Sequence, residues 1–331
     1  MSTKRKYVRR AIDDADAADS AAETATMPKR GPGRPPSLPP MPELEMRGIV
    51  SSPSHPDHLI EFAYGRPAIF KSLFTYLKNV KSQDIHIRFS PTGITFFARD
   101  HVKKSKIIAV IDGSKANWFY CQEKMDFVLR RDLVDNMFAS IDKSFYKCTI
   151  IYSQVFPDAL QFVFKDPTAD KECSYQINVA LPMEDTELYE SEKETRTDYI
   201  EANFPVHFTL SAKMFKKSLT DLCREVDTVH IEKLGDAPLQ LTFGKEGMEF
   251  HEIYRNAEKI KLHSTITRES IFRIALQIEN IKYLAGAMVA DEIRICCRSD
   301  GDILFRSDDD NKIMIVNTLT NIAEVRQFSG P

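Results

Sequence analysis

The chain has 331 residues, enough for one or two domains with a substantial core. Its 45 basic and 48 acidic residues give a formal net charge of −3, which argues against a diffusely basic, histone-like binder. No apolar run approaches the roughly 18 residues of a membrane span, and the charged N-terminus lacks a signal-peptide core, so we expect neither a membrane segment nor secretion. The six cysteines are scattered, and we expect free thiols in a reducing compartment.

The first 57 residues are predicted to form a disordered arm. They are charged at the start and Pro-rich over Pro28–Pro42, so they bury too little apolar surface to offset the entropy of ordering. Within the arm, Lys29–Pro36 resembles an AT-hook, an extended minor-groove motif for A/T-rich DNA, although Pro32 replaces the usual first arginine. A flexible linker and an import signal around Lys4–Arg10 are the alternatives. The residues expected in the minor groove are Arg30, Gly33, Arg34 and Pro35.

The next part of the chain alternates helix-like and strand-like segments. After a strand at Leu59–Tyr64, the apolar spacing predicts an amphipathic helix over Pro67–Lys81. A second helix is predicted at Arg131–Lys143, with Leu133 among its buried residues. The other strands expected here are Ile85–Phe89, Gly93–Arg99, Lys106–Asp112, Trp118–Cys121, Thr149–Ser153 and Leu160–Lys165.

A second series of the same kind follows an acidic segment, Pro182–Asn203, that has no clear period and is expected to be a surface connector. Ser211 is a natural N-cap for a helix over Ala212–Glu225, and a further helix is expected at Ile278–Val289. The strands expected in this half are Val229–Leu234, Leu239–Phe243, Gly247–Tyr254, Lys259–Thr265, Ile293–Cys297, Asp302–Ser307 and Lys312–Thr318.

One short stretch occurs in both series. Lys71-Ser72-Leu73 is followed by Lys78, and Lys217-Ser218-Leu219 is followed at the same offset by Arg224. Each copy gives its helix an apolar face and a basic stripe. The ordinary interpretation of one stripe is a solvated surface, and duplication would also copy an indifferent surface. Two stripes in an acidic chain nevertheless indicate local attraction to a polyanion.

Several strings, in one order along the chain, resemble sliding clamps of the proliferating-cell-nuclear-antigen type. The first is Gly93–Asp100, followed by Ile107–Ile111 and Trp118–Cys121. The resemblance covers about residues 58–323, and it extends in particular to the clamp-like proteins of asfarviruses. The strings shared with those proteins are Leu73-Phe74, Phe138-x-Ser140-Ile141-Asp142-x-Ser144-Phe145, Lys171-Glu172-Cys173, Ile231–Gly235 and Ala287-Met288-Val289.

This resemblance implies an α+β, two-domain DNA-clamp fold, in which helices line a ring and antiparallel sheets lie outside. Subunits of the family join edge strand to edge strand, usually as a homotrimer around duplex DNA. The expected divisions are an arm (1–57), a first clamp domain (58–181), a connector (182–203), a second clamp domain (204–323) and a tail (324–331).

The resemblance also assigns site residues. Partners are expected to dock beside the connector and the C-terminal strand, although the basic loop 101–106 departs from the family pattern. The residues expected to face DNA phosphates are Lys71, Lys78, Lys143, Lys213, Lys217, Arg224 and Lys282. The edge segments expected at subunit contacts are Ser174–Val179 and Glu258–Ser264, with Tyr175, Ile177, Val179, Ile260 and Leu262. The residues expected in the partner pocket are Val102, Leu319 and Ile322.

We therefore expect a processivity factor that tethers a DNA polymerase or other replication and repair enzymes to duplex DNA at a host-cell site of viral replication, a cytoplasmic factory or the nucleus. The alternatives are a clamp-fold DNA-binding or transcription adaptor that does not encircle DNA, and a scaffold without DNA. We find no phosphate-binding loop and no metal-spaced Cys/His cluster, and the acidic run Asp308-Asp309-Asp310 is expected to be a solvated turn. No enzyme activity, cofactor or metal is therefore expected.

Overall fold

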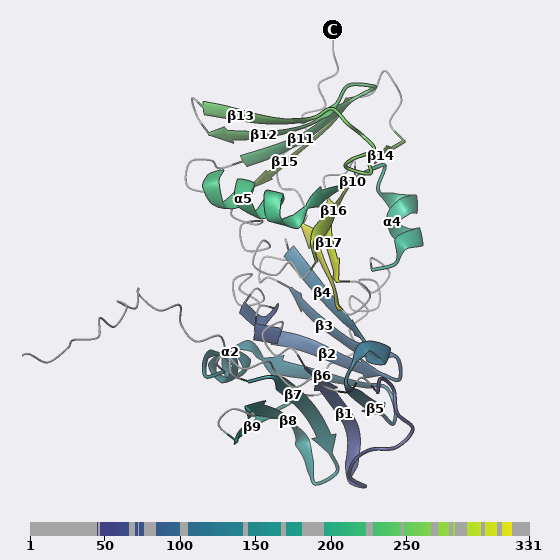
Figure 1. Ribbon diagram of the computed structural model, residues 1–331, viewed down its shortest axis with the longest axis vertical. Helices are drawn as coiled ribbons and strands as arrows, with labels where there is room; N and C mark the ends of the chain where they lie inside the picture. The colour runs from purple at the N-terminus through teal and green to yellow at the C-terminus, as the bar shows by residue number, and fades with distance from the viewer. Residues whose placement is uncertain are drawn as a thin grey trace, which may run out of the picture. The chain divides into compact units, whose positions relative to one another are not determined.

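The structure, a computed structural model, consists mostly of antiparallel strands with few helices among the residues that it describes (Figure 1). Two units are distinguished, residues 1–42 and residues 43–331, and all described residues belong to the second. The described residues are 45, 47–65, 70–71, 73–75, 84–99, 105–141, 145–166, 170–180, 195–222, 228–245, 248–265, 271–277, 281, 290–298, 302–309 and 313–319.

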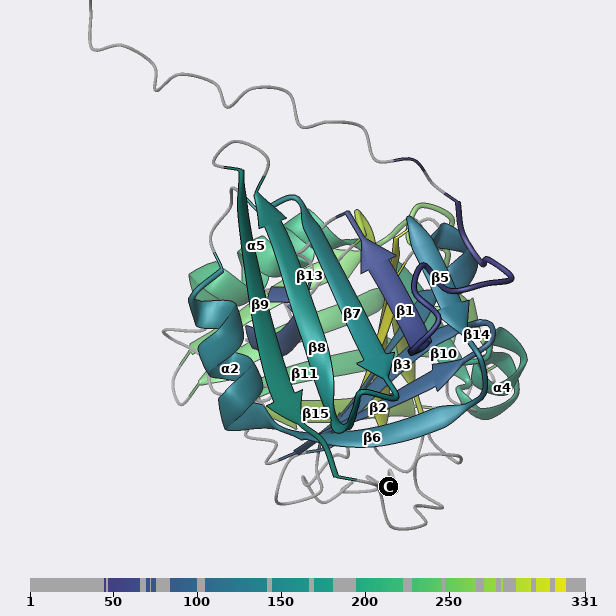
Figure 2. The ribbon, with the colours of Figure 1, turned by 90° about the horizontal axis from the view of Figure 1, so that it is seen from below.

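The first sheet belongs wholly to the first half of the chain. Its strand order is β5-β1-β7-β8-β9, and all of its pairings are antiparallel (Figure 2). Large apolar side chains occur at every second position of β1, and those of Ile60 and Phe62 are fully buried. The strand bounds are β5 Trp118–Cys121, β1 His58–Tyr64, β7 Lys147–Ser153, β8 Phe156–Asp166 and β9 Lys171–Asn178.

The second sheet has nine strands and is shared by the two halves. Its order is β14-β10-β16-β17-β18-β4-β3-β2-β6. From the second half it takes β14 His263–Ser264, β10 Val206–Ser211, β16 Glu292–Cys297, β17 Ile303–Asp309 and β18 Ile313–Leu319. From the first half it takes β4 Ser105–Asp112, β3 Gly93–Arg99, β2 Asp84–Ser90 and β6 Met125–Arg130.

The third sheet belongs to the second half and has the order β13-β12-β11-β15. The described helices are few, and the turn Gly113–Lys115 (η1) adds a short 3-10 segment. The helices are α2 Arg131–Ala139, α4 Thr197–Asn203 and α5 Ala212–Leu222. The strands of the third sheet are β13 Met248–Tyr254, β12 Leu239–Lys245, β11 Thr228–Leu234 and β15 Ile271–Gln277.

The two halves repeat one strand order. In the first half, β5-β1-β7-β8-β9 accompanies β4-β3-β2-β6; in the second, β14-β10-β16-β17-β18 accompanies β13-β12-β11-β15. By position in this order, β18 is the counterpart of β9, and β13 is the counterpart of β4. β18 pairs with β4 along its whole length, from Ile313 opposite Ile111 to Leu319 opposite Ser105. This pairing is the junction between the halves.

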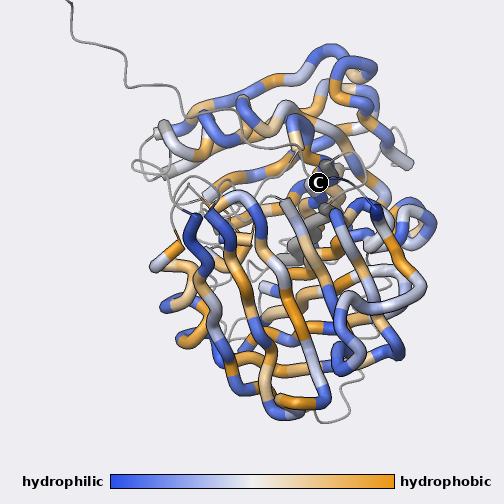
Figure 3. The backbone as a smooth tube through the Cα atoms, turned by 60° about the horizontal axis from the view of Figure 1, so that its bottom comes forward, coloured by the Kyte–Doolittle hydropathy of each residue, from blue (hydrophilic) through white to orange (hydrophobic). Residues whose placement is uncertain are grey.

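One hydrophobic core runs through both halves. Phenylalanine rings fill much of it: Phe74 stacks on Phe138 with ring centroids 4.6 Å apart and meets Phe96 edge to face at 5.6 Å. Hydrophobic and hydrophilic residues alternate along many of the strands (Figure 3), as expected for sheets with one buried face. Burial of this kind is what fixes the register, because a one-residue slip would turn every side chain to the other face.

Some predicted elements are wrong. Segment 257–261 forms a turn in place of the strand expected at 259–265, and only His263 and Ser264 pair with β10. The expected connector contains α4, whose Ile200 packs with Phe204 and Leu304 in a small separate core. Leu133 of α2, expected to be buried, is 37% exposed, and α2 ends at Ala139. A single apolar residue on a helix does not show by spacing alone whether anything covers it.

The boundary predicted for the disordered arm, at residue 57, is also too far along the chain. Residue 45 and residues 47–57 lie in the described part of the chain, and several of their backbone groups bond to β5, β1 and the β7–β8 turn. Backbone pairing of this kind depends on an edge strand far away in the sequence, so composition does not reveal it. The part of the arm that carries the AT-hook-like motif lies outside the described residues.

Candidate nucleic-acid interface and open sheet edges

The clearest cationic surface among the described residues is one face of α5. Ser211 precedes the helix, and its hydroxyl accepts a long hydrogen bond from the Met214 amide at 3.5 Å, as an N-cap does. Phe215 and Leu219 are buried on the inner face. The fixed inner face directs the opposite face of the helix to solvent.

Three lysines share the solvent face of α5. Lys213, Lys216 and Lys217 are exposed, and at 100° per residue they fall within about 100° of one another around the helix axis. No ion pair is found for them among the described residues, so their charge is available to a polyanion. Lys216 was not predicted, although it extends the same stripe that contains Lys213 and Lys217. The spacing i, i+4, i+7 and i+11 that starts at Lys213 omits Lys216.

α5 is tied to the edge strand β13 through one carboxylate. Glu252 accepts a hydrogen bond from the Ser218 hydroxyl of the helix at 2.7 Å and another from the Tyr254 hydroxyl at 2.8 Å. Burial, together with this bond to Glu252, raises the pKa of the Tyr254 phenol, so the phenol remains a donor at physiological pH. Glu252 therefore links the cationic helix α5 to the strand β13.

Lys71, predicted to face DNA, has a structural contact. Its ammonium donates to the carbonyl oxygen of Ile141 at 2.6 Å, just beyond the end of α2. A lysine that satisfies a free carbonyl after a helix stabilises that end of the helix. The side chain is still exposed, but part of its hydrogen-bonding capacity is taken. The repeated Lys-Ser-Leu stretch thus has different surroundings in its two copies.

α2 carries little free positive charge in its described part. Arg130 pairs with Asp132 at 2.6 Å, and Arg131 lies 3.6 Å from Asp135. Those four charges sum to zero. On the described helices, positive charge without an ion-pair partner is therefore concentrated on α5, and α2 contributes a neutral, partly apolar surface.

Within the described ranges, two strands that correspond to the junction strands have no partner beyond their own sheet. β9 pairs with β8 and β13 pairs with β12, and each ends its sheet. β13 also exposes apolar side chains, with Phe250 45% and Ile253 44% exposed. An open edge that carries apolar residues is a ready template for another strand.

The predicted contact residues in β9, and Val179 directly after it, point inward. Ile177 is buried, Tyr175 and Val179 pack against the core, and the Tyr175 hydroxyl lies 2.6 Å from the Ser140 hydroxyl at the end of α2. Any contact at this edge would therefore use the backbone of β9 and its exposed neighbours. Figure 2 shows β9 as the last strand of its sheet, beside α2.

The second predicted contact segment does not form a free edge. Ile260 is buried and its carbonyl accepts from the Thr209 amide of β10 at 2.7 Å, while the Leu262 amide donates to the Ala257 carbonyl at 2.9 Å. The Ile260 carbonyl and the Leu262 amide are thus already hydrogen-bonded within the chain. The strand that occupies the open position is β13, about ten residues earlier.

The remaining predicted residues divide into two groups. Leu319 is the last residue of β18, opposite Ser105. Lys78, Lys143, Arg224, Lys282, Val102, Ile322 and the minor-groove residues Arg30, Gly33, Arg34 and Pro35 lie outside the described residues. Over the described ranges, no cluster of three potential metal ligands occurs, and no helix is long and apolar enough to cross a membrane.

Comparisons with known proteins give both close relatives and a structural likeness. The chain is 43% identical over 296 residues to an uncharacterized protein of African swine fever virus, from a Kenyan pig isolate, covering 89% of this chain and 98% of that protein. The same viral protein from a Malawian tick isolate is 43% identical over 294 residues, covering 88% and 97%. No protein-family model matches the chain.

The structural likeness is to the proliferating cellular nuclear antigen of Entamoeba histolytica. The TM-score is 0.61 at 13% sequence identity, and the match covers 80% of this chain and 99% of that chain. At this identity the likeness shows the fold alone, which is clamp-like.

Proposed function

Because the chain belongs to the family of this African swine fever virus protein and has a clamp-like fold, we propose that it is a sliding clamp of viral DNA replication. In this proposal, copies of the chain close into a ring, a homotrimer as in the clamps that it resembles, around duplex DNA. The ring tethers a DNA polymerase and other replication or repair enzymes. The chain itself performs no catalysis, needs no cofactor and acts where the viral genome is copied.

One observation carries the proposal: the junction between the halves can be repeated between copies. Inside the chain, β18 pairs with β4, and their counterparts β9 and β13 are edges left without a partner in the described part of the chain. Pairing β9 of one copy with β13 of the next would reproduce the internal junction. Such a contact joins two different surfaces, so it is heterologous and generates a closed ring when the rotation closes.

The lysines of α5 supply the expected attraction to DNA. Lys213, Lys216 and Lys217 would contact phosphates, which carry no sequence information. Three exposed ammonium groups attract a duplex without fixing its register, because each contact is weak and readily exchanged with counterions. Retention would then come from encirclement, which keeps the duplex at high effective concentration.

The first experiment tests ring closure through β13. Phe250→Asp and Ile253→Asp place a charge on exposed apolar positions of the open edge, and Leu234→Asp is the matched control because Leu234 is 45% exposed on β11 of the same sheet. In sedimentation over a concentration series, we expect the two edge variants to raise the dissociation constant of the assembly at least ~10-fold. Leu234→Asp should leave it unchanged. An equal effect of all three variants, or a full-length chain that is monomeric throughout, would refute the ring.

The second experiment tests topological retention. The protein is loaded on nicked circular DNA, the DNA is linearised in half of the sample, and bound protein is measured at moderate salt. A ring slides off free ends, so we expect release only after linearisation. Equal retention on both forms would instead support a DNA-binding adaptor that does not encircle its substrate.

The third experiment tests the lysine face. Replacing Lys213, Lys216 and Lys217 together by Gln should reduce the slope of log binding constant against log salt by roughly 0.9 for each phosphate that is no longer neutralised. Lys165→Gln is the control, since Lys165 is already paired with Glu172 at 2.8 Å. An unchanged slope in the triple variant would remove α5 from the DNA-binding surface.

A further inference from the structure

The edge of the first sheet opposite β9 is already occupied by the chain itself. The occupant, here called the edge segment, is residues 47–50. The Phe119 amide of β5 donates to the Gly48 carbonyl at 2.9 Å, and the Val50 amide donates to the Phe119 carbonyl at 2.8 Å. The bridge is parallel. The edge segment thus lies beside β5 as a short added strand.

Further contacts hold the edge segment in place. The Arg47 amide donates to the Asn117 carbonyl and the Gly48 amide donates to the Ala116 carbonyl, both at 3.1 Å. The Arg47 guanidinium lies over the Trp118 ring, 5.7 Å from its centroid. Backbone bonds and one cation–π contact therefore act together along this edge.

Glycine is required at the centre of the edge segment. Gly48 has a φ of +65°, which side chains other than glycine rarely adopt, and it is buried. A Cβ placed there would come within 2.9 Å of the Ser114 backbone oxygen. Because both the backbone conformation and the space exclude a larger residue, position 48 is a specific requirement of this docking mode.

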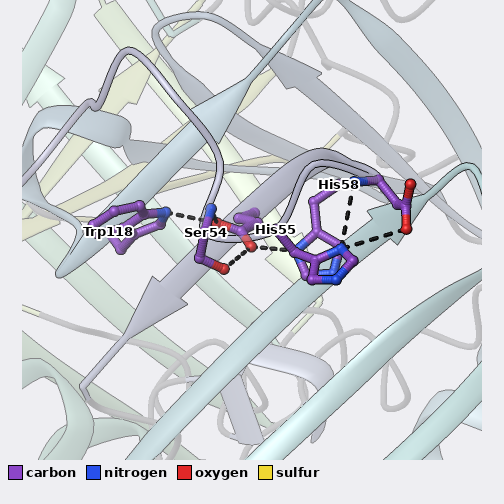
Figure 4. A network of polar contacts seen from close by, with 6 residues as sticks. Ser54, His55, His58 and Trp118 are labelled. Carbon is purple, nitrogen blue, oxygen red and sulfur yellow. Dashed lines mark hydrogen bonds and ion pairs between the residues drawn. The ribbon is translucent and has the colours of Figure 1, made fainter.

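The segment returns to β1 through a polar network shown in Figure 4. The buried carboxylate of Glu61 accepts hydrogen bonds from the Ser54 amide at 2.8 Å, from the Ser54 hydroxyl, and from the indole N–H of Trp118 at 2.8 Å. Glu61 also meets the His58 ring. The Glu61 carboxylate of β1 therefore links Ser54, which lies between the edge segment and β1, to Trp118 of β5.

We propose that the β5 edge is a binding site for an extended peptide in parallel register, and that the chain's own edge segment fills it. Filling it keeps the β5 edge from taking a strand of another molecule. β9 then remains as the open edge of this sheet, which gives the ring of the proposed function a single direction of growth. The single direction of growth rests on that proposed function, whereas the filled β5 edge does not depend on it.

Two other outer edges are also blunted. β14, the counterpart of β5 in the second half, has only two residues, so it offers little template for pairing. β6, at the far end of the nine-stranded sheet, exchanges both backbone bonds with Ala180 at 2.8 and 3.0 Å. Three edges are thus blunted by three different means, while β9, β13 and β15 have no further strand beside them within the described ranges.

The test compares two single variants of the full chain by hydrogen exchange and mass spectrometry. Gly48→Val should release the edge segment, so the amides of Val50 and Phe119 should exchange at least ~10-fold faster. Ile49→Ser is the matched control, because the Ile49 side chain is 51% exposed and only the backbone of this residue lies at the bridge. The Gln122 amide, bonded to Leu59 of β1 at 3.0 Å, should stay protected in both variants and shows that the sheet is folded.

A second arm of the test uses a synthetic peptide of residues 43–52. Added to the Gly48→Val chain, it should restore protection at Phe119, whereas the same peptide carrying Val at position 48 should not. Sedimentation should show assemblies larger than those of the unaltered chain when the edge is open, and the peptide should reverse them.

The outcomes separate the two proposals. Unchanged exchange at Phe119 in the Gly48→Val chain, or no rescue by the peptide, overturns the peptide-binding edge whether or not the ring exists. Faster exchange and rescue in a chain that never self-associates would confirm the filled edge and refute the ring.

Discussion

Replacing Glu61 by Ala should destabilise the protein by about 4 kcal/mol. Glu61 is 3% exposed, and its carboxylate is contacted by the Ser54 amide, the Ser54 hydroxyl, the Trp118 indole and the His58 ring. Bonds to a charged acceptor contribute about 1.5–3 kcal/mol each, and a buried donor left without a partner costs about 1–3 kcal/mol. Water entering the truncated site recovers part of this loss. The net figure agrees with the cost of about 3–5 kcal/mol for removing one member of a buried charged network.

Glu61→Gln should cost much less, about 1–2 kcal/mol near pH 8. The amide oxygen can still accept from the Ser54 amide and from Trp118, as one carboxylate oxygen now does. The amide nitrogen can donate to the Ser54 hydroxyl and can keep the contact with the His58 ring. The substitution removes only the charge that strengthens these bonds.

Urea unfolding, followed by circular dichroism and by tryptophan fluorescence, measures both variants. Trp118 is the only tryptophan in the chain, so fluorescence reports directly on the network. For a chain of this size, a loss of 4 kcal/mol corresponds to a fall of roughly 6 °C in the melting temperature. Glu172→Ala is the control, because Glu172 belongs to an exposed pair with Lys165 and should cost under ~1 kcal/mol. A loss below about 1 kcal/mol in Glu61→Ala would show that the network does not hold this edge together.

Three further predictions follow from single contacts. Burial raises the pKa of Glu61, but hydrogen bonds from Ser54 and His58 outweigh it and leave that pKa below its ordinary value. The resulting stability is present above the ordinary carboxyl pKa and is lost as pH falls through the lower, folded value, so the urea midpoints of the unaltered chain and Glu61→Gln should converge on acidification. Burial raises the pKa of Cys121 to about 11, so native iodoacetamide labelling at pH 8 should be at least ~100-fold slower there than after unfolding; equal rates would contradict that burial. Lys71→Ala should lower the free energy of unfolding by about 1 kcal/mol and leave the salt slope of DNA binding nearly unchanged. Lys217→Ala should reduce the salt slope and leave the free energy of unfolding nearly unchanged. Identical behaviour of the two variants would contradict the structural role assigned to the contact between Lys71 and Ile141.

Much of the strand content was predictable, because its signals are local. The expected strand Gly93–Arg99 coincides with β3, and Trp118–Cys121 coincides with β5. Apolar alternation and the turn residues between strands depend on neighbouring positions only. The basic stripe containing Lys213 and Lys217 was visible for the same reason, since helical periodicity places both on one face.

Features of the site that depend on residues far apart in the sequence were missed or misplaced. The open edge is β13 and not the segment around Ile260, whose carbonyl is taken by β10. Whether the Lys71 ammonium is free or bonded depends on the carbonyl of Ile141, 70 residues later in the chain. No local pattern contains this information.

Local sequence signals predicted the duplicated series of strands, and the resemblance to sliding clamps predicted the clamp-like fold. Composition and periodicity are properties of neighbouring residues, so they survive without the fold. Which edges are open and which are filled depends on pairing between strands that are far apart in the sequence. Residues 47–50 read as part of a polar arm until β5 supplies the backbone partners, and β9 and β13 are recognisable as free edges only once β18 is paired with β4. Strand pairing is a long-range property, and it determines which surfaces of this protein remain available to another molecule.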